Sequence, residues 1–335
     1  MPTVVLDTMG SDHGAGVLVE GACMLSLDSS TDIVLVGQEE LLHNSLKRHS
    51  HHKGQIHIVN APKYISMDDD PKKIVRDSSL YIAAELVQKG KGEALVSAGN
   101  TGAVVMCALR TFQHLHGIPK VALAAVYPTK KTHGPRKDPF ALLLDVGATL
   151  HVRAEDLVGF ALMGSVYARI ISDNPSPKVA LLSNGAEPKK GAPEVVRAHA
   201  LLHNQKEICF VGNVEGIDIP KGSSDVVVCE GFLGNVVLKM IEGVGEVAST
   251  LIRSVSIKTG KNWDPVLYKA VERFTSLTDW KQYGGAPILG LDKVVIKAHG
   301  RSTARAVRNA LKLANRAVER DMIEKIQEGI TRVLS

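Results

Sequence analysis

The sequence predicts an α/β fold: a three-layer, doubly wound, mainly parallel sheet with helices on both faces. Short β-branched or aliphatic runs recur along the 335-residue chain without clear polar alternation, and helix-length segments separate most of them. Strands of this kind are typical of parallel sheets that are covered on both faces. The expected strands are residues 3–6, 32–36, 56–59, 94–96, 122–127, 141–144, 179–182, 208–211, 225–228 and 294–296.

Residues 236–284 break this alternation and predict a helical hairpin that projects from the sheet. One apolar stripe at helical spacing ends at GKNWDP, where Asp264 and Pro265 suit the N-cap and first position of a second helix, and a second stripe follows. The tail from Ser302 also has helical spacing. We therefore expect a single α/β domain over 1–335, with the hairpin within it.

Composition excludes several functional classes. Hydrophobic residues make up 44% of the chain and charged residues 22%, with no uninterrupted apolar stretch of membrane-spanning length. The N-terminal sequence has no signal-peptide pattern, which predicts a cytoplasmic protein. A net charge of +5 with 4% aromatic residues argues against nucleic acid but suits an anionic small molecule or an acidic protein. The four cysteines form no C-x-x-C pair and are expected to be reduced.

Residues 97–102, Ser-Ala-Gly-Asn-Thr-Gly, join an expected strand to a helix-like apolar run. The free N–H groups and positive dipole end of such a helix can bind phosphate. The segment is neither a P-loop nor a G-x-G-x-x-G motif. A tight packing turn explains the same residues equally well, so the turn alone leaves both interpretations open.

Two later turns carry candidates for carbonyl chemistry. In SNGAEPKKGAPE, residues 183–194, Lys189 and Lys190 lie in a glycine-flanked loop after a strand, where a lysine can neutralise phosphate or polarise a carbonyl oxygen. In CEGFLGNVVLK, residues 229–239, Asn235 could donate its amide N–H to a developing oxyanion. Two solvated lysines and an asparagine N-cap are the structural alternatives.

Other patterns favour structure over chemistry. The acids at 68–70 before Pro71 are typical of a helix start, and HSHHKGQIH lacks the ligand spacing of a structural zinc site. Cys229 lies in an apolar run with no histidine beside it, so packing is favoured over a thiol nucleophile. We expect no metal and no cofactor.

Nine segments, taken in order, resemble the phosphate acyltransferase (PlsX) family of bacterial phospholipid synthesis, and the resemblance runs essentially end to end. They are LDTMGSDHG, LVSAGNTGA, LLLDVGAT, FALMGSVYA, KKGAPE, VGNVEGIDI, DVVVCEGFLGNVVLK, YGGAPILG and VVIKAHGRS. The resemblance implies a fold similar to phosphotransacetylases and isopropylmalate dehydrogenases. It also implies transfer of a long-chain fatty acyl group from acyl carrier protein to inorganic phosphate.

The resemblance implies partners as well. They are acyl carrier protein, inorganic phosphate, a second copy of the chain in a homodimer, and a membrane glycerol-3-phosphate acyltransferase. It further implies peripheral membrane contact through residues 240–284, where apolar and basic side chains suit an anionic lipid surface. The expected location is cytoplasmic and peripherally membrane-associated, with no nucleic-acid partner.

The implied reaction needs no enzyme nucleophile, because the attacking oxygen belongs to phosphate. Positioning and charge stabilisation then supply the catalysis. Matched to the family, Lys190 and Asn235 are expected to be catalytic by polarising the thioester carbonyl, although Lys189 is an alternative to Lys190. The expected phosphate- and acyl-binding residues are His13, Ser97, Asn100, Thr101, Gly102, Asp145, Asn213, Glu215 and His299.

The chain departs from the family pattern in these motifs. Ser11, Thr149, Ala192 and Glu230 stand where the family usually has Gly, Asn, Asn and Asp, and an Asn is usual near Thr303. A catalytically weak paralogue that acts as a lipid-synthesis scaffold is therefore one alternative. A short-chain phosphotransacetylase, which shares the chemistry, is another.

Overall fold

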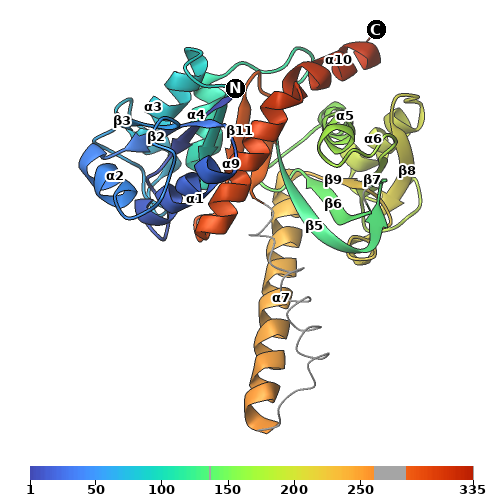
Figure 1. Cartoon of the computed structure of the whole chain (residues 1–335). Coiled ribbons are helices and arrows are strands. Elements are labelled where there is room, and N and C mark those ends of the chain that lie inside the picture. The colour runs from blue at the N-terminus through green and yellow to red at the C-terminus, as the bar shows by residue number, and fades with distance from the viewer. Residues whose placement is uncertain (136, 260–283, 335) are drawn as a thin grey trace.

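The computed structural model describes residues 1–135, 137–259 and 284–334, which form an eleven-stranded sheet with helices on both sides (Figure 1). The strands are β1 (Thr3–Asp7), β2 (Asp32–Gly37), β3 (Ile56–Asn60), β4 (Ala94–Ser97), β5 (Ala122–His133), β6 (Asp138–Leu144), β7 (Lys178–Leu182), β8 (Cys209–Val214), β9 (Val226–Val228), β10 (Ala286–Leu289) and β11 (Val294–Lys297). The helices are α1 (Ala15–Asp28), α2 (Glu39–Leu46), α3 (Ser79–Gln88), α4 (Thr101–Thr111), α5 (Ala154–Ile171), α6 (Pro193–His203), α7 (Gly231–Thr259), α9 (Ala304–Glu319) and α10 (Met322–Leu334). Two 3-10 helices are η1 (Pro71–Lys73) and η2 (Gly216–Asp218).

The sheet consists of two halves that meet at β10. Its strand order is β3-β2-β1-β4-β11-β10-β5-β6-β9-β7-β8. The strands from β3 to β11 are parallel to one another, as are those from β6 to β8. β10 pairs antiparallel with β11 and with β5, and β5 pairs antiparallel with β6, so the second half runs opposite to the first. The predicted mainly parallel sheet is confirmed, with a reversal of direction at its centre.

The strands lack polar alternation because helices bury both faces of the sheet. In β1, Val4 and Leu6 belong to one hydrophobic cluster and Val5 to the other. Helices α1, α9, α5 and α10 contribute to the first cluster, and α3 and α4 contribute to the second. The fold therefore has the three predicted layers.

Each of the ten predicted strands overlaps an observed one, but the sequence prediction missed β10. This strand has four residues, contains Pro287 and follows Gly284 and Gly285. Proline and glycine both argue against a strand interior. β10 pairs with β5 at only two residues, Ile288 and Leu289. A pairing this short leaves no recognisable strand pattern in the sequence.

Helix α7 projects away from the sheet (Figure 1). Its 29 residues span about 44 Å at the rise of an α-helix. It corresponds to the first arm of the hairpin predicted for 236–284, and the second arm lies outside the described residues. In the C-terminal tail the predicted helix is two helices, α9 and α10, separated by Arg320 and Asp321.

Asp145, directly after β6, is completely buried and fixes the turn that follows. Its Oδ1 accepts hydrogen bonds from the N–H groups of Leu123 (2.9 Å), Gly147 (3.0 Å) and Ala148 (3.0 Å). Its Oδ2 accepts two more, from the N–H and the hydroxyl of Thr149, both at 2.8 Å. Because Leu123 belongs to β5, the carboxyl group ties this turn to the strand beside β10.

Replacement of Asp145 is expected to destabilise the fold. Asp145→Ala leaves buried N–H groups without an acceptor, at a cost of about 2–4 kcal/mol in the free energy of unfolding. Urea denaturation followed by circular dichroism measures the change. The exposed Asp68→Ala is the control and should stay within about 0.5 kcal/mol of the parent. Equal stabilities of the two variants would contradict the role given to Asp145.

Candidate functional site

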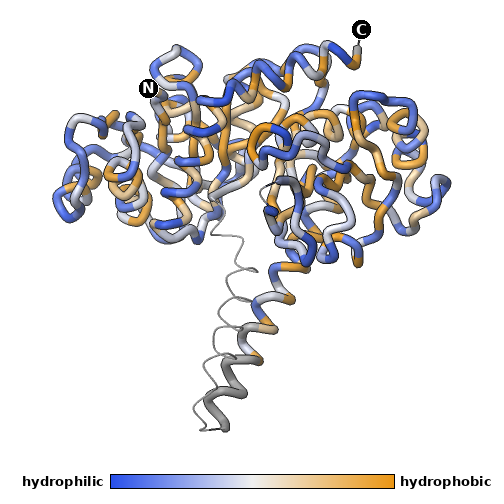
Figure 2. Tube along the Cα trace, turned by 45° about the vertical axis from the view of Figure 1, so that its right-hand side comes forward, coloured by the Kyte–Doolittle hydropathy of each residue, from blue (hydrophilic) through white to orange (hydrophobic). Residues whose placement is uncertain are grey.

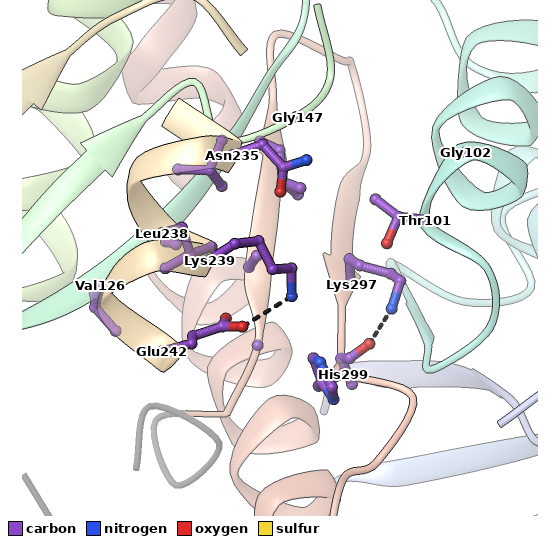
Figure 3. A pocket seen from close by; sticks show the side chains of 16 residues that line it. Thr101, Gly102, Val126, Gly147, Asn235, Leu238, Lys239, Glu242, Lys297 and His299 are labelled. Atoms are coloured by element: carbon purple, nitrogen blue, oxygen red, sulfur yellow. Dashed lines mark hydrogen bonds and ion pairs between the residues drawn. The ribbon is translucent and has the colours of Figure 1, made fainter. Parts of the chain in front are cut away.

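A cavity of about 320 Å³ lies over the central strands, between the first turns of α4 and of α7 (Figure 3). Leu123 and Ala125, neighbours on one face of β5, line it together with Ala286 of β10. Its polar lining comes from both halves of the sheet: Thr101, Asn235, Lys239, Glu242, Lys297 and His299. The junction of the two halves therefore gathers polar groups from segments far apart in the sequence.

One wall of this cavity is the N-terminus of α4. Asn100 caps the helix, because its Oδ1 accepts the N–H of Ala103 at 3.1 Å and its Nδ2 donates to the carbonyl of Met67 at 2.8 Å. Thr101 and Gly102 occupy the first helical positions, whose N–H groups have no acceptor within the helix. Both residues line the cavity, so α4 presents its positive dipole end to that space.

Lys297, the last residue of β11, adds a cation to the same wall. It is 6% exposed and lines the cavity, and its Nζ donates a hydrogen bond to the carbonyl of Ala298. Burial lowers the pKa of Lys297 to about 8, while the charge of Asp12 acts in the opposite direction. His299 lies beside it, with its Nδ1 accepting the N–H of Arg301 at 3.1 Å.

The opposite wall is the first turns of α7, which pack closely on the Asp145 turn. Thr149 Oγ1 accepts the N–H of Gly231 at 3.1 Å. A Cβ on Gly231 would lie 2.4 Å from Asp145 Oδ2, and one on Gly234 would lie 1.8 Å from the Asp145 carbonyl oxygen. Only glycine permits this approach. The packing sets the position of Asn235, one residue further along the helix.

Asn235 and Lys239 extend from α7 into the cavity, toward the side that carries Lys297 (Figure 3). Lys239 Nζ forms an ion pair with Glu242 Oε2 at 2.8 Å, which neutralises much of its charge. The Asn235 side chain packs against Gly147, since a Cβ on that glycine would contact it at 3.9 Å. The α7 wall therefore offers an amide donor and a neutralised lysine.

A second cavity, of about 590 Å³, lies against the same turns of α7 and the loop after β7. Leu233 and Val237 of α7, Leu182 and Val195 give it an apolar lining. Glu230 also lines it. Two cavities thus meet α7 near its start, and among the described residues the first contains two lysines and a histidine that the second lacks.

Lys190 and Lys189 are exposed in the loop after β7, and neither lines the first cavity. Their neighbours Gly191 and Ala192 line the second cavity. β7 is separated from the junction by β9, β6 and β5, which explains why this loop does not reach the α4 wall. Of the two residues expected to be catalytic, the structure brings Asn235 alone into the first cavity.

Three of the nine expected binding residues line the first cavity, namely Thr101, Gly102 and His299. The other six lie elsewhere or support the turns. His13 and Glu215 are exposed. Asn100 and Asp145 make the hydrogen bonds described above. Ser97 is buried and donates to Asp7 Oδ2 at 2.7 Å, and Asn213 donates to the carbonyl of Glu187 at 2.9 Å. Asn213 thereby holds the loop that carries Lys190.

Most of the departures from the family pattern have local structural partners. Ser11 donates its hydroxyl to the carbonyl of Gly14 at 3.1 Å. Thr149 bridges Asp145 and α7, and Thr303 caps α9 by accepting the N–H of Ala306 at 3.3 Å. Ala192 is the N-cap residue of α6, without a side-chain bond. None of these four lines the first cavity.

Sequence reasoning missed Lys239 and Lys297. Lys239 ends the segment CEGFLGNVVLK, and Lys297 ends the apolar run Val-Val-Ile-Lys. The available signal was a lysine at the end of a buried strand, where a charge is costly unless it has a partner or a ligand. The thiol of Cys229 fits the packing interpretation, since burial raises its pKa and it donates to the carbonyl of Asp145 at 3.4 Å.

Two other features are absent from residues 1–135, 137–259 and 284–334. In these ranges no group of three or more His, Cys, Asp or Glu side chains is arranged to hold a metal ion. Among the helices of the described segments, none combines the length and hydropathy needed to span a bilayer.

Comparison with known proteins gives a consistent result. A family model described as "Fatty acid synthesis protein" matches residues 2–325. The phosphate acyltransferases of Dictyoglomus turgidum and Gloeobacter violaceus are 39% and 38% identical to this chain, over 98% of it and over 98% and 96% of their own lengths.

Solved structures agree on the fold. A phosphotransacetylase from Streptococcus pyogenes has a TM-score of 0.61 at 18% identity, covering 95% of this chain and 94% of its own. The EutD phosphotransacetylase from Staphylococcus aureus has a TM-score of 0.59 at 15% identity, covering 98% and 94%. At these identities the likeness shows the fold alone, and it confirms the predicted similarity of fold to phosphotransacetylases. The family model and the full-length relatives show that this chain belongs to the phosphate acyltransferase family and is an acyltransferase.

Proposed function

We propose that this protein transfers a long-chain fatty acyl group from acyl carrier protein to inorganic phosphate, giving an acyl phosphate for phospholipid synthesis. The observation that carries the proposal is the cavity at the junction of the half-sheets. There the N-terminus of α4 can attract an anion, and Asn235 offers an amide donor from the opposite wall. The names of the full-length relatives support acyl transfer to phosphate.

In the proposed reaction a phosphate oxygen forms a bond to the thioester carbonyl carbon, and the carbon–sulfur bond then breaks. The electron pair of that bond leaves with sulfur, and the proton of monohydrogen phosphate goes to the departing thiolate. The carbonyl oxygen carries negative charge in between, so a fixed N–H donor near it lowers the barrier. No nucleophilic side chain is required.

The position of each residue determines the role that we propose for it. The N–H groups of Thr101 and Gly102 are proposed to bind phosphate, with His299 beside them. Asn235 is proposed to donate to the carbonyl oxygen. Lys190 is proposed to supply positive charge from the loop that borders the second cavity, whose apolar lining suits part of the acyl–carrier substrate.

Substitution of Asn235 tests its proposed role. Asn235→Ala should lower turnover on the order of 10²–10³-fold, as expected for the loss of one oxyanion donor. Stopped-flow or steady-state thiol release measures the effect. Unchanged turnover would remove Asn235 from the site.

Lys190→Ala is a separate test, because Lys190 is outside the first cavity. We expect a decrease of similar order if the loop supplies the carbonyl cation. Lys189→Ala is the matched neighbour, with an expected change below about threefold. Near-normal turnover of both variants would assign the cation elsewhere and leave the role of Asn235 standing.

A homodimer through α7 is also proposed. Met240, Val244, Val247 and Leu251 are 59–69% exposed and recur at helical spacing, so they form one apolar stripe along α7. Figure 2 shows hydrophobic residues recurring along the described part of this helix. Such a stripe is typical of an interaction surface. Val247→Asp should give a monomer in analytical ultracentrifugation, whereas Thr250→Asp, an exposed position off the stripe, should not. A dimeric Val247→Asp would argue against this interface.

Peripheral membrane contact through residues 240–284 remains part of the proposal. Trp263, Leu267 and Phe274, on which it depends, lie outside the described residues. Vesicle co-sedimentation of the parent and of Leu267→Asp tests this contact separately from the dimer. Unchanged vesicle binding by the variant would argue against this membrane contact and leave dimerisation as the role of the α7 stripe.

One assay tests the function. Purified protein is given long-chain acyl carrier protein, long-chain acyl-CoA or acetyl-CoA, with and without phosphate, and thiol release is followed. The proposal expects phosphate-dependent release that is fastest with the acyl carrier protein. A preference for acetyl-CoA would indicate a short-chain phosphotransacetylase, and no release from any donor would indicate a scaffold protein.

A further inference from the structure

The buried lysine at the end of β11 is the least expected side chain of the first cavity. Lys297 is 6% exposed and lies beside Thr101 and His299 on the wall across from Lys239 (Figure 3). Burying an ammonium group is unfavourable unless its hydrogens find acceptors. An alkyl side chain would fill the same space without that penalty, so packing alone does not account for a lysine here.

The hydrogen bonds of Lys297 are incomplete. An ammonium group has three donors, and in the described part of the chain the Ala298 carbonyl is the acceptor that the structure gives it. Lys239 differs, since its Nζ lies 2.8 Å from a carboxylate oxygen of Glu242. Between these two lysines, Lys297 therefore has the greater capacity to attract an anion into the cavity.

The start of α4 reinforces this capacity. Thr101 and Gly102 line the cavity beside Lys297, and their N–H groups have no acceptor within the helix. Phosphate binds well where such N–H groups and a cation converge. β11 and α4 are adjacent because β11 pairs with β4, with Lys297 opposite Ser97.

We propose that Lys297 holds the phosphate nucleophile, in a subsite that it forms with the N-terminus of α4. This inference rests on the proposed function. Phosphate bound there lies on the wall across from Asn235, and the thioester carbonyl enters between the two. Lys297 holds the phosphate anion in place through its positive charge and takes no proton from it.

Lys297→Met tests the subsite, because methionine keeps the length of the side chain and removes its charge. The KM for phosphate should rise about 10- to 100-fold, which corresponds to the loss of one charge-assisted hydrogen bond. The KM for the acyl donor should change less than about threefold. Lys293→Met, at the position directly before β11, is the matched control and should leave both constants unchanged. A phosphate KM in Lys297→Met within twofold of the parent would overturn the inference.

Phosphate binding without an acyl donor separates this inference from the proposed function. Inorganic phosphate should raise the melting temperature of the parent protein and of Lys293→Met, but not of Lys297→Met. If the parent shows that response and yet transfers no acyl group, the proposed function fails and the subsite stands. If phosphate raises the melting temperature of Lys297→Met as much as that of the parent, the subsite fails.

Stability also distinguishes a ligand-binding lysine from a structural one. The pKa of Lys297 in the folded protein, about 8, is below its ordinary value of 10.5. The unfolded chain therefore binds more protons between these values, and this group destabilises the fold at neutral pH. In the absence of phosphate, Lys297→Met should melt at the same or a higher temperature. A large decrease in its melting temperature would indicate a structural role and contradict the proposal.

The pH profile gives a further readout. The charges that act on Lys297 are those of Asp7 and Asp12, which raise its pKa, and of Lys239, which lowers it, with the imidazole of His299 also in the cavity. As pH rises through about 8, the free enzyme loses the Lys297 proton, and kcat/KM for phosphate should fall. In Lys297→Met this decrease should be absent. A decrease of the same size in the variant would assign the titration to another group and count against Lys297.

Discussion

The buried carboxyl group of Asp145 is the contact on which the site depends. Five hydrogen bonds converge on its two oxygens, from β5 and from the turn after β6. The first residues of α7 then pack against the same turn at distances that only glycine permits. One buried acceptor thus fixes both the floor of the cavity and the helix that carries Asn235. Asp145 was expected to bind substrate, and in the structure its two oxygens accept these five donors.

The two walls of the cavity differ in their electrostatics. On the α4 side an incompletely bonded lysine and a helix dipole both favour negative charge. On the α7 side the Lys239–Glu242 pair contributes little net charge, and the amide of Asn235 is neutral. An anionic nucleophile and a neutral carbonyl group would therefore be attracted to different walls. This separation matches the chemistry of acyl transfer to phosphate, in which charge moves from the nucleophile toward the carbonyl oxygen.

Local sequence predicted most of the fold but only part of the site. Runs such as Val4 to Leu6 identify strands because both faces of the sheet are buried, and helical spacing identified α7. β10 was missed because Pro287 and its flanking glycines outweigh a four-residue pattern. Lys190 and Asn235 were expected to act on the same carbonyl group, but the strand reversal at β10 and the distance of β7 from the junction keep the loop of Lys190 away from the α4 wall. The sequence does not identify Lys297 as a site residue, because its burial depends on the packing of β4, β10 and α4 together.

The short ladder between β10 and β5 has a mechanical consequence. Two residue pairs join the half-sheets at this seam, whereas β1 and β2 share five. On the back of the sheet α10 contacts both α9 and α5, and so links the halves behind the seam. Flexing of the molecule will concentrate where so few backbone hydrogen bonds resist it. Because the cavity lies directly over that seam, a small twist of one half against the other changes the gap between nucleophile and carbonyl group without unfolding either half.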